Sequence, residues 1–337
     1  MSAIEKFAAR ARTVSRTIVL PEGQDPRVVA AANKAVDEKV VAKIIVLGTE
    51  AEISAACKQA GVTERKFECL DYMASDLLQK FADQMYELRK AKGVDQQKAL
   101  AMVSSRIYFG AMMCRNKLAD GLVAGSIAST ADMLRAAFHC IGTAPGIKSA
   151  SSCFVMDLAA PSPAGDDVLV FADCGVNPNP DADMLVDIAA ATSKTYRALI
   201  GKQPKVAFLS FSTRGSAKNE ILEKITAAAE KFAAKIKAEN LDVICDGEIQ
   251  ADAALVPSVA KAKAPDSPLA GGANILIFPD LNAGNIAYKL VQRLARAQAY
   301  GPVLQGLATP LNDLSRGCSA EDIVGTICVT LLQSQTK

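Results

Sequence analysis

Residues 17–47 read TIVLPEGQDPRVVAAANKAVDEKVVAKIIVL, and this stretch decides the class of fold. Two short apolar runs, Thr17–Leu20 and Ala42–Leu47, enclose the amphipathic segment Pro26–Glu38. Continuous apolar runs are typical of parallel strands covered on both faces, and a helix usually connects such strands. The stretch therefore predicts a strand–helix–strand unit of an α/β fold.

The same alternation continues along the chain. Further strands are predicted at 121–124, 150–156, 168–171, 205–210, 243–245 and 273–278. Further helices are predicted at 1–10, 77–92, 131–140, 183–199, 220–239, 285–299 and 323–332. This pattern predicts an α/β protein of two domains, whose largely parallel sheets are flanked by helices.

Two turn-rich segments, Gly142–Gly146 and Tyr300–Pro302, mark the expected domain borders. We therefore expect a domain I formed by 1–145 plus 301–337, and an inserted domain II formed by 146–300. Ligands of open α/β sheets bind at the carboxyl ends of strands, and pockets often lie where domains meet. The sequence predicts an active-site cleft between the two domains.

Composition excludes several classes of protein. The chain has 337 residues, 50% of them hydrophobic and 22% charged, with a formal net charge of +2 and no basic block, so no nucleic-acid partner is expected. No apolar run reaches the roughly 18–20 residues that span a bilayer, and the amino-terminal segment lacks the features of a signal peptide. Nine scattered cysteines without a Cys-x-x-Cys pair indicate reduced thiols and a cytoplasmic protein. Because His139 is the only histidine, no metal site is predicted.

The segment Pro310–Asp322, PLNDLSRGCSAED, brings a hydroxyl, a guanidinium and carboxylates together just before the predicted helix 323–332. In one interpretation Ser319 and Asp322 only cap that helix. In the other, the loop supplies a base, a hydrogen-bond donor and a fixed positive charge together, as acyl transfer requires. For Ser315 and Arg316 the alternative is a surface turn with a salt bridge. An exposed carboxylate is a weak base, so catalysis by Asp322 requires its partial burial. A position at a helix amino terminus has the opposite effect, because it lowers the pKa of a carboxyl group and makes the carboxylate a weaker base.

A second cluster contains Ser129, Thr130, Asp132 and Arg135, and it also joins a strand to a helix. Ser129 and Asp132 have the spacing of a capping box, and Arg135 can pair with Asp132 within the helix. Alternatively, Arg135 projects into the cleft and binds a phosphate with its planar guanidinium. The spacing leaves both interpretations open.

Two further strand-to-helix turns are weaker candidates for binding an anion. Neither has the spacing of a dinucleotide or nucleoside-triphosphate fingerprint. Their candidate residues are Ser212, Thr213, Gly215, Ser216, Asn282 and Asn285. Arg89 lies at the end of a predicted helix, where a basic residue before glycine is also good capping. For His139, a satisfied position near a helix end is favoured over catalysis.

Taken together, these clusters resemble those of the phosphate acetyltransferase (phosphotransacetylase) family, in its short form. The resemblance extends along nearly the whole chain and is most specific at residues 86–93, 212–218, 246–254, 274–288 and 310–319. It implies the reversible conversion of acetyl phosphate and coenzyme A to acetyl-CoA and phosphate. Coenzyme A is then a substrate, no tightly bound cofactor is expected, and the resemblance implies a homodimer.

The resemblance also implies roles for residues. Asp322 matches the aspartate taken as the base for the CoA thiol, and Ser315 and Arg316 match residues that support the acyl carbonyl and phosphate. Arg89 and Arg135 match arginines associated with CoA and phosphate binding. We expect direct attack of the thiolate in a ternary complex, with Cys318 as a packed thiol and not a nucleophile.

Three other functions remain alternatives. The first is an acyltransferase that prefers butyryl phosphate, and the second is a non-catalytic module that senses acetyl-CoA. The third is an oxidoreductase with an isocitrate-dehydrogenase-like layout, although the sequence contains no dinucleotide fingerprint.

Overall fold

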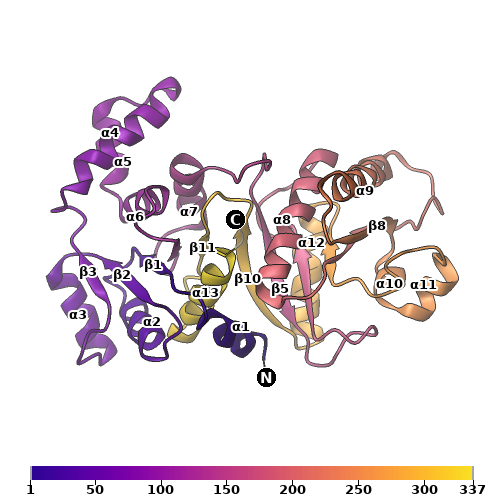
Figure 1. Cartoon of the computed structure of the whole chain (residues 1–337), viewed down its shortest axis with the longest axis horizontal. Helices are drawn as coiled ribbons and strands as arrows, with labels where there is room; N and C mark the ends of the chain where they lie inside the picture. Colours follow the sequence, from indigo (N-terminus) through magenta and orange to yellow (C-terminus); the bar gives the residue numbers. More distant parts are fainter. Residues whose placement is uncertain (1, 336–337) are drawn as a thin grey trace. The chain divides into compact units, whose positions relative to one another are not determined.

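The computed structural model describes residues 2–335, and the chain divides into two units (Figure 1). Unit 1 contains the described residues up to Ala144 together with those from Leu307 onward. Unit 2 contains Pro145–Gly306. The chain thus leaves unit 1 once, builds unit 2, and returns to complete unit 1.

Unit 1 is built on a five-stranded sheet in the order β11-β4-β1-β2-β3, in which every neighbouring pair is parallel. Its strands are β1 (Thr17–Leu20), β2 (Lys43–Leu47), β3 (Glu68–Leu70), β4 (Gly121–Ala124) and β11 (Leu311–Asp313). Ile18 of β1 is in register with Ile44 on one side and Gly121 on the other. Because β11, β4 and β1 are parallel neighbours, the loops that follow them open at the same edge of the sheet.

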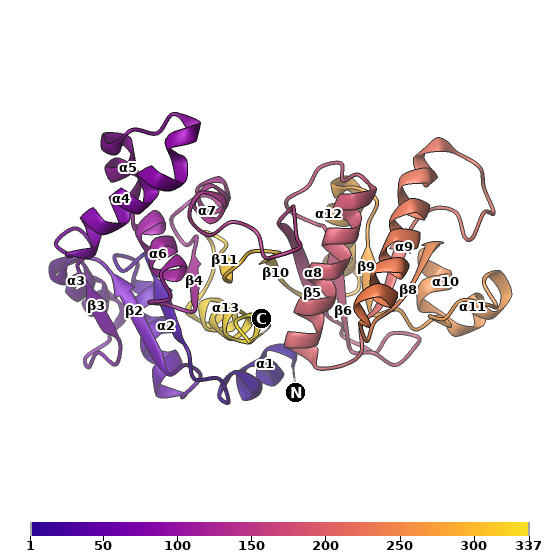
Figure 2. The ribbon, with the colours of Figure 1, turned by 45° about the horizontal axis from the view of Figure 1, so that its top comes forward.

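Helices surround this sheet. They are α1 (Ala3–Ala11), α2 (Pro26–Asp37), α3 (Glu50–Ala60), α4 (Leu77–Arg89), the short 3-10 turn η1 (Lys90–Lys92), α5 (Gln96–Val103), α6 (Arg106–Arg115), α7 (Thr130–Ala136), the π-helical turn η2 (Ala137–Ile141) and α13 (Ala320–Gln333). Helices α1 and α2 both pack on α13, while α4 and α5 pack on each other beside α6 (Figure 2). The start of α2 follows from its sequence, because Asp25 accepts a hydrogen bond from the Arg27 N–H and Pro26 occupies the first helical position.

Unit 2 is built on a six-stranded sheet in the order β10-β5-β6-β9-β7-β8. Its strands are β5 (Ser151–Asp157), β6 (Val168–Ala172), β7 (Lys205–Leu209), β8 (Ile244–Ile249), β9 (Ile275–Ile277) and β10 (Gln298–Gln305). Strands β6, β9, β7 and β8 are parallel, whereas β5 runs antiparallel to both of its neighbours, β6 and β10. The predicted α/β class with largely parallel sheets is therefore confirmed, and β5 is the exception.

The helices of unit 2 are α8 (Ala182–Ile200), α9 (Glu220–Glu239), α10 (Ala251–Leu255), α11 (Pro257–Lys263) and α12 (Leu281–Leu294). Helices α8 and α9 lie side by side (Figure 2), and α12 packs against β5, β6 and β10. Apolar side chains from the sheet, α10 and the loops around it form a buried core, in which Met156, Ile249 and Ala253 are completely inaccessible to solvent. Each unit thus encloses its own layers of sheet and helix.

One predicted helix was placed wrongly. The sequence predicted helix over 285–299, but α12 ends at Leu294 and β10 begins at Gln298. Arg296 adopts a left-handed conformation with φ 53°, which stops the helix, and the residues that follow pair with β5. Pairing with a strand more than a hundred residues earlier overrides the local helical pattern.

Candidate active site

Three loops meet at the carboxyl edge of the unit 1 sheet. They follow β1, β4 and β11, which are neighbours in the sheet. The loop after β11 contains Ser315 and Arg316, and the loop after β4 contains Ser129 and leads into Thr130. The structure therefore brings together, within unit 1, two of the clusters that the sequence predicted as functional.

A buried glutamate, Glu22, holds the loop after β4 in place. Its carboxylate accepts hydrogen bonds from the N–H groups of Gly125 and Ser126 (both 2.8 Å), Ile127 (3.0 Å) and Ala128 (2.7 Å), and from the Ser126 hydroxyl (2.8 Å). These backbone groups point at one anion, as in loops that bind phosphate, but here the anion is a side chain of the protein. Sequence reasoning missed Glu22, although its position directly after a buried strand was a signal.

Arg27 ties all three loops together. Its guanidinium donates to the carbonyl oxygens of Arg316 (2.8 Å), Cys318 (3.0 Å) and Ser126 (3.1 Å). It also pairs with the buried Asp25 at 2.6 Å. Burial alone would raise the Asp25 pKa, but the hydrogen bonds from Arg27 and Ser126 and the Arg27 charge together outweigh it, so the pKa lies below its ordinary value. Sequence reasoning missed Arg27 too, because its partners lie up to 291 residues away.

The turn that Arg27 holds leaves its functional groups at the surface. Ser315 and Arg316 are both exposed, and the Ser315 hydroxyl accepts only a long hydrogen bond, 3.3 Å, from the Gly317 N–H. The guanidinium of Arg316 makes no hydrogen bond or ion pair with any residue between 2 and 335. A hydroxyl and a positive charge are thus presented on a backbone that is fixed from behind.

Asp322 forms the capping box that the sequence predicted. Its Oδ2 accepts from the Ser319 N–H and from the Ser319 hydroxyl (both 2.9 Å), and its own N–H donates to the Ser319 hydroxyl at 3.1 Å. The capping interpretation is therefore confirmed. The side chain is exposed, so the partial burial required of a thiol base is absent from unit 1 taken by itself.

The cluster after β4 also shows its local interactions. Ser129 caps α7 by accepting from the Asp132 N–H at 3.2 Å, and Arg135 forms the predicted ion pair with Asp132. The Arg135 side chain is 62% exposed despite that pair. Thr130 is exposed as well, and its hydroxyl donates to Asp313, the last residue of β11. Arg135 therefore forms the ion pair within the helix and still leaves its guanidinium accessible, so both interpretations are compatible with this one conformation.

Arg89 and Arg135 approach the same pair of side chains. The Tyr108 hydroxyl lies 2.8 Å from Nδ1 of His139, in η2. Burial lowers the pKa of His139, and the positive charges of Arg89 and Arg135 lower it further. Within the described part of the chain, the buried Nε of Arg89 has no hydrogen-bond partner. The predicted satisfied histidine is confirmed, and the charges of both predicted binding arginines act on it.

In unit 2, the predicted binding loop closes on a buried carboxylate. Glu248 accepts from the hydroxyls of Ser212 and Thr226 (both 2.9 Å) and from the Gly215 N–H (2.7 Å). Burial alone would raise the pKa of Glu248, but these hydrogen bonds lower it below its ordinary value. The other hydroxyls of the loop also have partners. The Ser216 hydroxyl bonds to that of Ser212 and accepts from the Thr213 N–H, and the Thr213 hydroxyl bonds to Gln250, which directly follows β8.

The two asparagines of α12 differ. The Asn285 amide donates to the carbonyl oxygen of Cys174 at 3.1 Å, which ties α12 to the loop after β6. Asn282 is exposed in the first turn, which Asp280 caps. Asn282 therefore has the more accessible side chain of the two.

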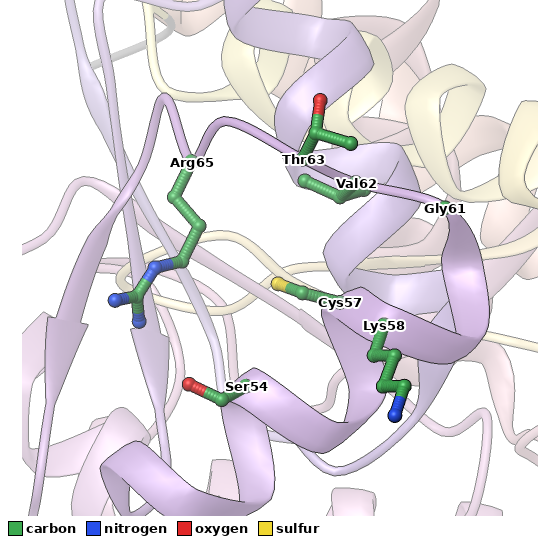
Figure 3. Close-up of a pocket in the computed structure, with 7 residues that line it drawn as sticks. All are labelled: Ser54, Cys57, Lys58, Gly61, Val62, Thr63 and Arg65. Atoms are coloured by element: carbon green, nitrogen blue, oxygen red, sulfur yellow. The ribbon is translucent and has the colours of Figure 1, made fainter.

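A surface hollow of about 400 Å³ lies elsewhere in unit 1. Figure 3 shows that its lining comes from α3 and the loop after it: Ser54, Cys57, Lys58, Gly61, Val62, Thr63 and Arg65. None of the predicted substrate-binding residues lines it, and Arg65 there pairs with Glu50 at 2.7 Å. The hollow is thus separate from the three-loop cluster.

Residues 2–335 contain neither a cluster of metal ligands nor a membrane-spanning helix. Among residues 2–335, no group of three or more histidine, cysteine, aspartate or glutamate side chains is arranged to hold a metal ion. Over the same range, the structure has no helix of the length and hydropathy that crossing a bilayer requires.

Comparisons with known proteins agree along the whole chain. The family model described as "Phosphate acetyl/butaryl transferase" matches residues 2–331. The phosphate acetyltransferase of Thermoanaerobacterium thermosaccharolyticum is 48% identical over 99% of this chain and 100% of its own length. The solved EutD phosphotransacetylase from Staphylococcus aureus superposes with a TM-score of 0.91 at 38% identity, covering 99% of both chains. A phosphotransacetylase from Streptococcus pyogenes gives a TM-score of 0.89 at 39% identity, covering 99% of this chain and 97% of that one. The chain belongs to this family of phosphate acyltransferases.

Proposed function

We propose that the protein catalyses the reversible transfer of an acetyl group between acetyl phosphate and coenzyme A. Family membership and full-length relatives named phosphate acetyltransferase support this activity. The observation in the structure that carries the proposal is the turn at Ser315 and Arg316, whose backbone is held by Arg27 while both side chains stay exposed. A hydroxyl donor and a planar cation on a fixed turn suit an acyl carbonyl and a phosphate.

In this scheme the CoA thiol gives its proton to Asp322, and the sulfur attacks the carbonyl carbon of acetyl phosphate. Negative charge develops on the carbonyl oxygen, where Ser315 and Arg316 stabilise it; one such donor is typically worth about 3–4 kcal/mol. The bond between the carbonyl carbon and the phosphate oxygen then breaks, and phosphate leaves with the electron pair. No acyl-enzyme is formed.

Asp322 can cap its helix and accept a proton with different oxygens. Oδ2 is used in the capping box, whereas Oδ1 accepts no hydrogen bond from residues 2–335. We propose that bound CoA supplies the burial that the protein alone does not, because removing water from a carboxylate makes it a stronger base. General-base catalysis of this kind contributes on the order of 10²–10⁴ in rate.

The cysteines favour direct transfer over a covalent route. Burial raises the pKa of Cys318, the thiol next to the turn, with Arg27 offsetting only part of that effect. Burial likewise raises the pKa of the other eight thiols. Because the thiolate is the nucleophile, a raised pKa makes each of them a poor one.

The binding roles form part of the same proposal. Arg89 and Arg135 bind the phosphates of CoA and acetyl phosphate, supported by the effect of both charges on His139 and by the Nε of Arg89, which has no partner among residues 2–335. Ser129 and Thr130 contribute hydroxyls from the loop after β4. In unit 2 we propose supporting roles for six further residues. Most of them use their hydrogen bonds within the protein, which favours a role in shaping the loops over direct contact with a substrate. The six are Ser212, Thr213, Gly215, Ser216, Asn282 and Asn285.

We also propose a homodimer located in the cytoplasm, without a tightly bound cofactor. Helix α12 supports the dimer, because Ile286, Leu290 and Leu294 are more than half exposed at a spacing of four residues and form one apolar stripe. The nine unpaired cysteines fit a reducing compartment. Light scattering of the purified chain tests the dimer directly: a mass of one chain would contradict it.

The activity is tested by following thioester formation from acetyl phosphate and CoA through its ultraviolet absorbance, with no metal or nicotinamide added. Acetyl-CoA formation that depends on both substrates supports the proposal, and no turnover contradicts it. Running propionyl and butyryl phosphate in parallel decides the acyl preference, for which we expect the acetyl ester to be best. Tight binding of acetyl-CoA without turnover would instead indicate a sensing module.

A further inference from the structure

A buried carboxyl group, Asp313, lies behind the candidate site and takes no part in the mechanism above. It is the last residue of β11 and is only 6% exposed. Its Oδ1 is buried and has no hydrogen-bond partner among residues 2–335. The same oxygen packs against Gly125, where an added Cβ would lie only 2.2 Å from it. Glycine at position 125 is therefore what makes room for this carboxyl group.

The other oxygen of Asp313 connects the buried group to the surface. The Thr130 hydroxyl meets Oδ2 at 2.5 Å, and Thr130 itself is exposed at the start of α7. A hydroxyl has one hydrogen to donate. When Thr130 donates that hydrogen to an ionised Asp313, only its lone pairs remain for a ligand, and lone pairs repel an anion.

The surroundings of Asp313 make both protonation states accessible. Burial raises the pKa of Asp313 to about 6; the Thr130 hydroxyl and the neighbouring Leu314 N–H act in the opposite direction, and the Glu22 charge adds to the rise. Glu22 comes from the loop after β1, and the next charges along the chain, Asp25 in that loop and Arg27 in α2, are paired with each other. Helix α7, which carries Thr130, adds Asp132 and Arg135, and these two also pair with each other. Strand β4 and the part of α13 that packs on β11 present neutral side chains there.

We propose that Asp313 is a positioning residue that sets the direction of the Thr130 hydroxyl and thereby the affinity of the site for phosphate. When Asp313 carries a proton, it donates that proton to Thr130 Oγ1, and the hydroxyl hydrogen of Thr130 is free to donate outward to a phosphate oxygen. When Asp313 is ionised, the hydroxyl hydrogen points inward and the outward donor is lost. The inference rests on the proposed function, because it assumes that Thr130 contacts phosphate.

Substitutions that fix each state of this switch are available. Asp313→Asn can donate to Thr130 at every pH and imitates the protonated carboxyl group. Thr130→Val removes the hydroxyl and so imitates the state in which no hydrogen-bond donor faces outward. Thr130→Ser keeps a hydroxyl at this position. Asp120→Asn is a matched control, because Asp120 precedes β4 and accepts from the Thr17 N–H at the opposite edge of the same sheet.

The experiment measures the dissociation constant of inorganic phosphate for the full chain by calorimetry, from about pH 5 to about pH 8. Phosphate also titrates in this range, so the quantity compared is the ratio of the constants of wild type and variant at each pH. For Asp313→Asn we expect the wild-type dissociation constant divided by that of the variant to be near one at the acid end of the range. The ratio should rise by on the order of tenfold at the alkaline end, where only the wild type loses the donor. Thr130→Val should bind phosphate weakly at every pH, without the increase in affinity that the wild type shows at the acid end. Thr130→Ser and Asp120→Asn should follow the pH profile of the wild type.

The outcomes are distinguishable. If wild type and Asp313→Asn both bind phosphate with a constant ratio across the range, the switch is wrong and the proposed function stands. Should Asp313→Asn fail to fold, Thr130→Val decides: a wild-type-like pH profile of phosphate affinity in that variant overturns the switch. If the wild type binds no phosphate at any pH and shows no turnover, the proposed function fails and the switch fails with it.

Discussion

In both units a buried carboxylate holds the loop that follows a strand, but the two units differ in which polar side chains stay exposed nearby. In unit 1 the Glu22 carboxylate accepts five hydrogen bonds from the loop after β4. In unit 2 the Asp173 carboxylate accepts six, from Ser152, Gly175, Val176 and Asn177. At the same edge of the unit 1 sheet, Ser315 and Arg316 remain exposed on the turn that Arg27 holds. In unit 2 the Ser212 hydroxyl turns inward to another buried carboxylate, Glu248.

This difference separates scaffold from chemistry. A buried carboxylate surrounded by N–H and O–H donors fixes a loop, because an unsatisfied group in such a place is costly. Fixing a loop is not enough for catalysis, which also requires donors and charges that the scaffold leaves accessible. Unit 1 satisfies both conditions at one sheet edge, and that is why we place the chemistry there.

The largest effect is expected on stability when either scaffold carboxylate is neutralised. Glu22→Gln and Asp173→Asn each place an amide where several donors point at one acceptor, so each should lower the free energy of unfolding by about 3–5 kcal/mol. Urea denaturation measures this. The control is Glu321→Gln, whose exposed, solvent-screened pair with Lys34 should leave the unfolding free energy unchanged within error. Losses below about 1 kcal/mol in both scaffold variants would contradict the comparison.

A smaller but functional effect is expected for Arg27→Lys. Lysine keeps a positive charge beside Asp25 but cannot reach the carbonyl oxygens of Arg316, Cys318 and Ser126 together. Displacement of the turn by about 1 Å should lower kcat/KM by on the order of 10². Steady-state kinetics measures it, with Arg197→Lys as the matched variant in unit 2, where Arg197 pairs with the exposed Asp242. Equal losses in both variants would mean that the tether has no specific role.

Arg89→Ala should mainly raise the KM for CoA, by about tenfold, with little change in kcat, since one charge-assisted hydrogen bond is lost. Lys90→Ala is the control, because Lys90 is the next basic residue and pairs with Glu87 at the surface. If Arg89→Ala and Lys90→Ala both leave the KM unchanged, Arg89 only caps its helix.

The smallest effect is expected for Cys318→Ala. The thiol is buried and its raised pKa makes it unreactive, so turnover should stay within about threefold of wild type. Single-turnover measurements with acetyl phosphate alone should show no acetylated protein. A loss of at least about a thousandfold in kcat would revive a covalent route.

Local patterns predicted much of the fold. The strands at 17–20 and 121–124 and the helix at 220–239 appear with the predicted bounds. The short strands β3 and β11 were missed, because three residues are too few to establish a periodicity. The antiparallel direction of β5 was missed as well, since direction depends on a connection and not on the strand itself.

The candidate site was predictable only where its contacts are local. The capping boxes at Ser129 and Ser319 follow from residues three positions apart, and both are present. Glu22, Arg27 and Asp313 act over separations of 99 to 291 residues, and a single sequence does not show which groups meet over such distances. Sequence thus indicated the exposed groups that we propose to face the ligand better than the groups that hold them.

The central claim is that the acidic first turn behind Ser315 and Arg316 removes the proton from the CoA thiol. The most direct test is kcat of Asp322→Asn, measured beside Glu321→Gln, which changes the other carboxylate of the same turn. The account predicts a loss on the order of 10²–10⁴ in kcat for Asp322→Asn, with CoA affinity nearly intact and little change for Glu321→Gln. If Asp322→Asn turns over within about threefold of wild type, Asp322 is only a helix cap and the assignment is wrong.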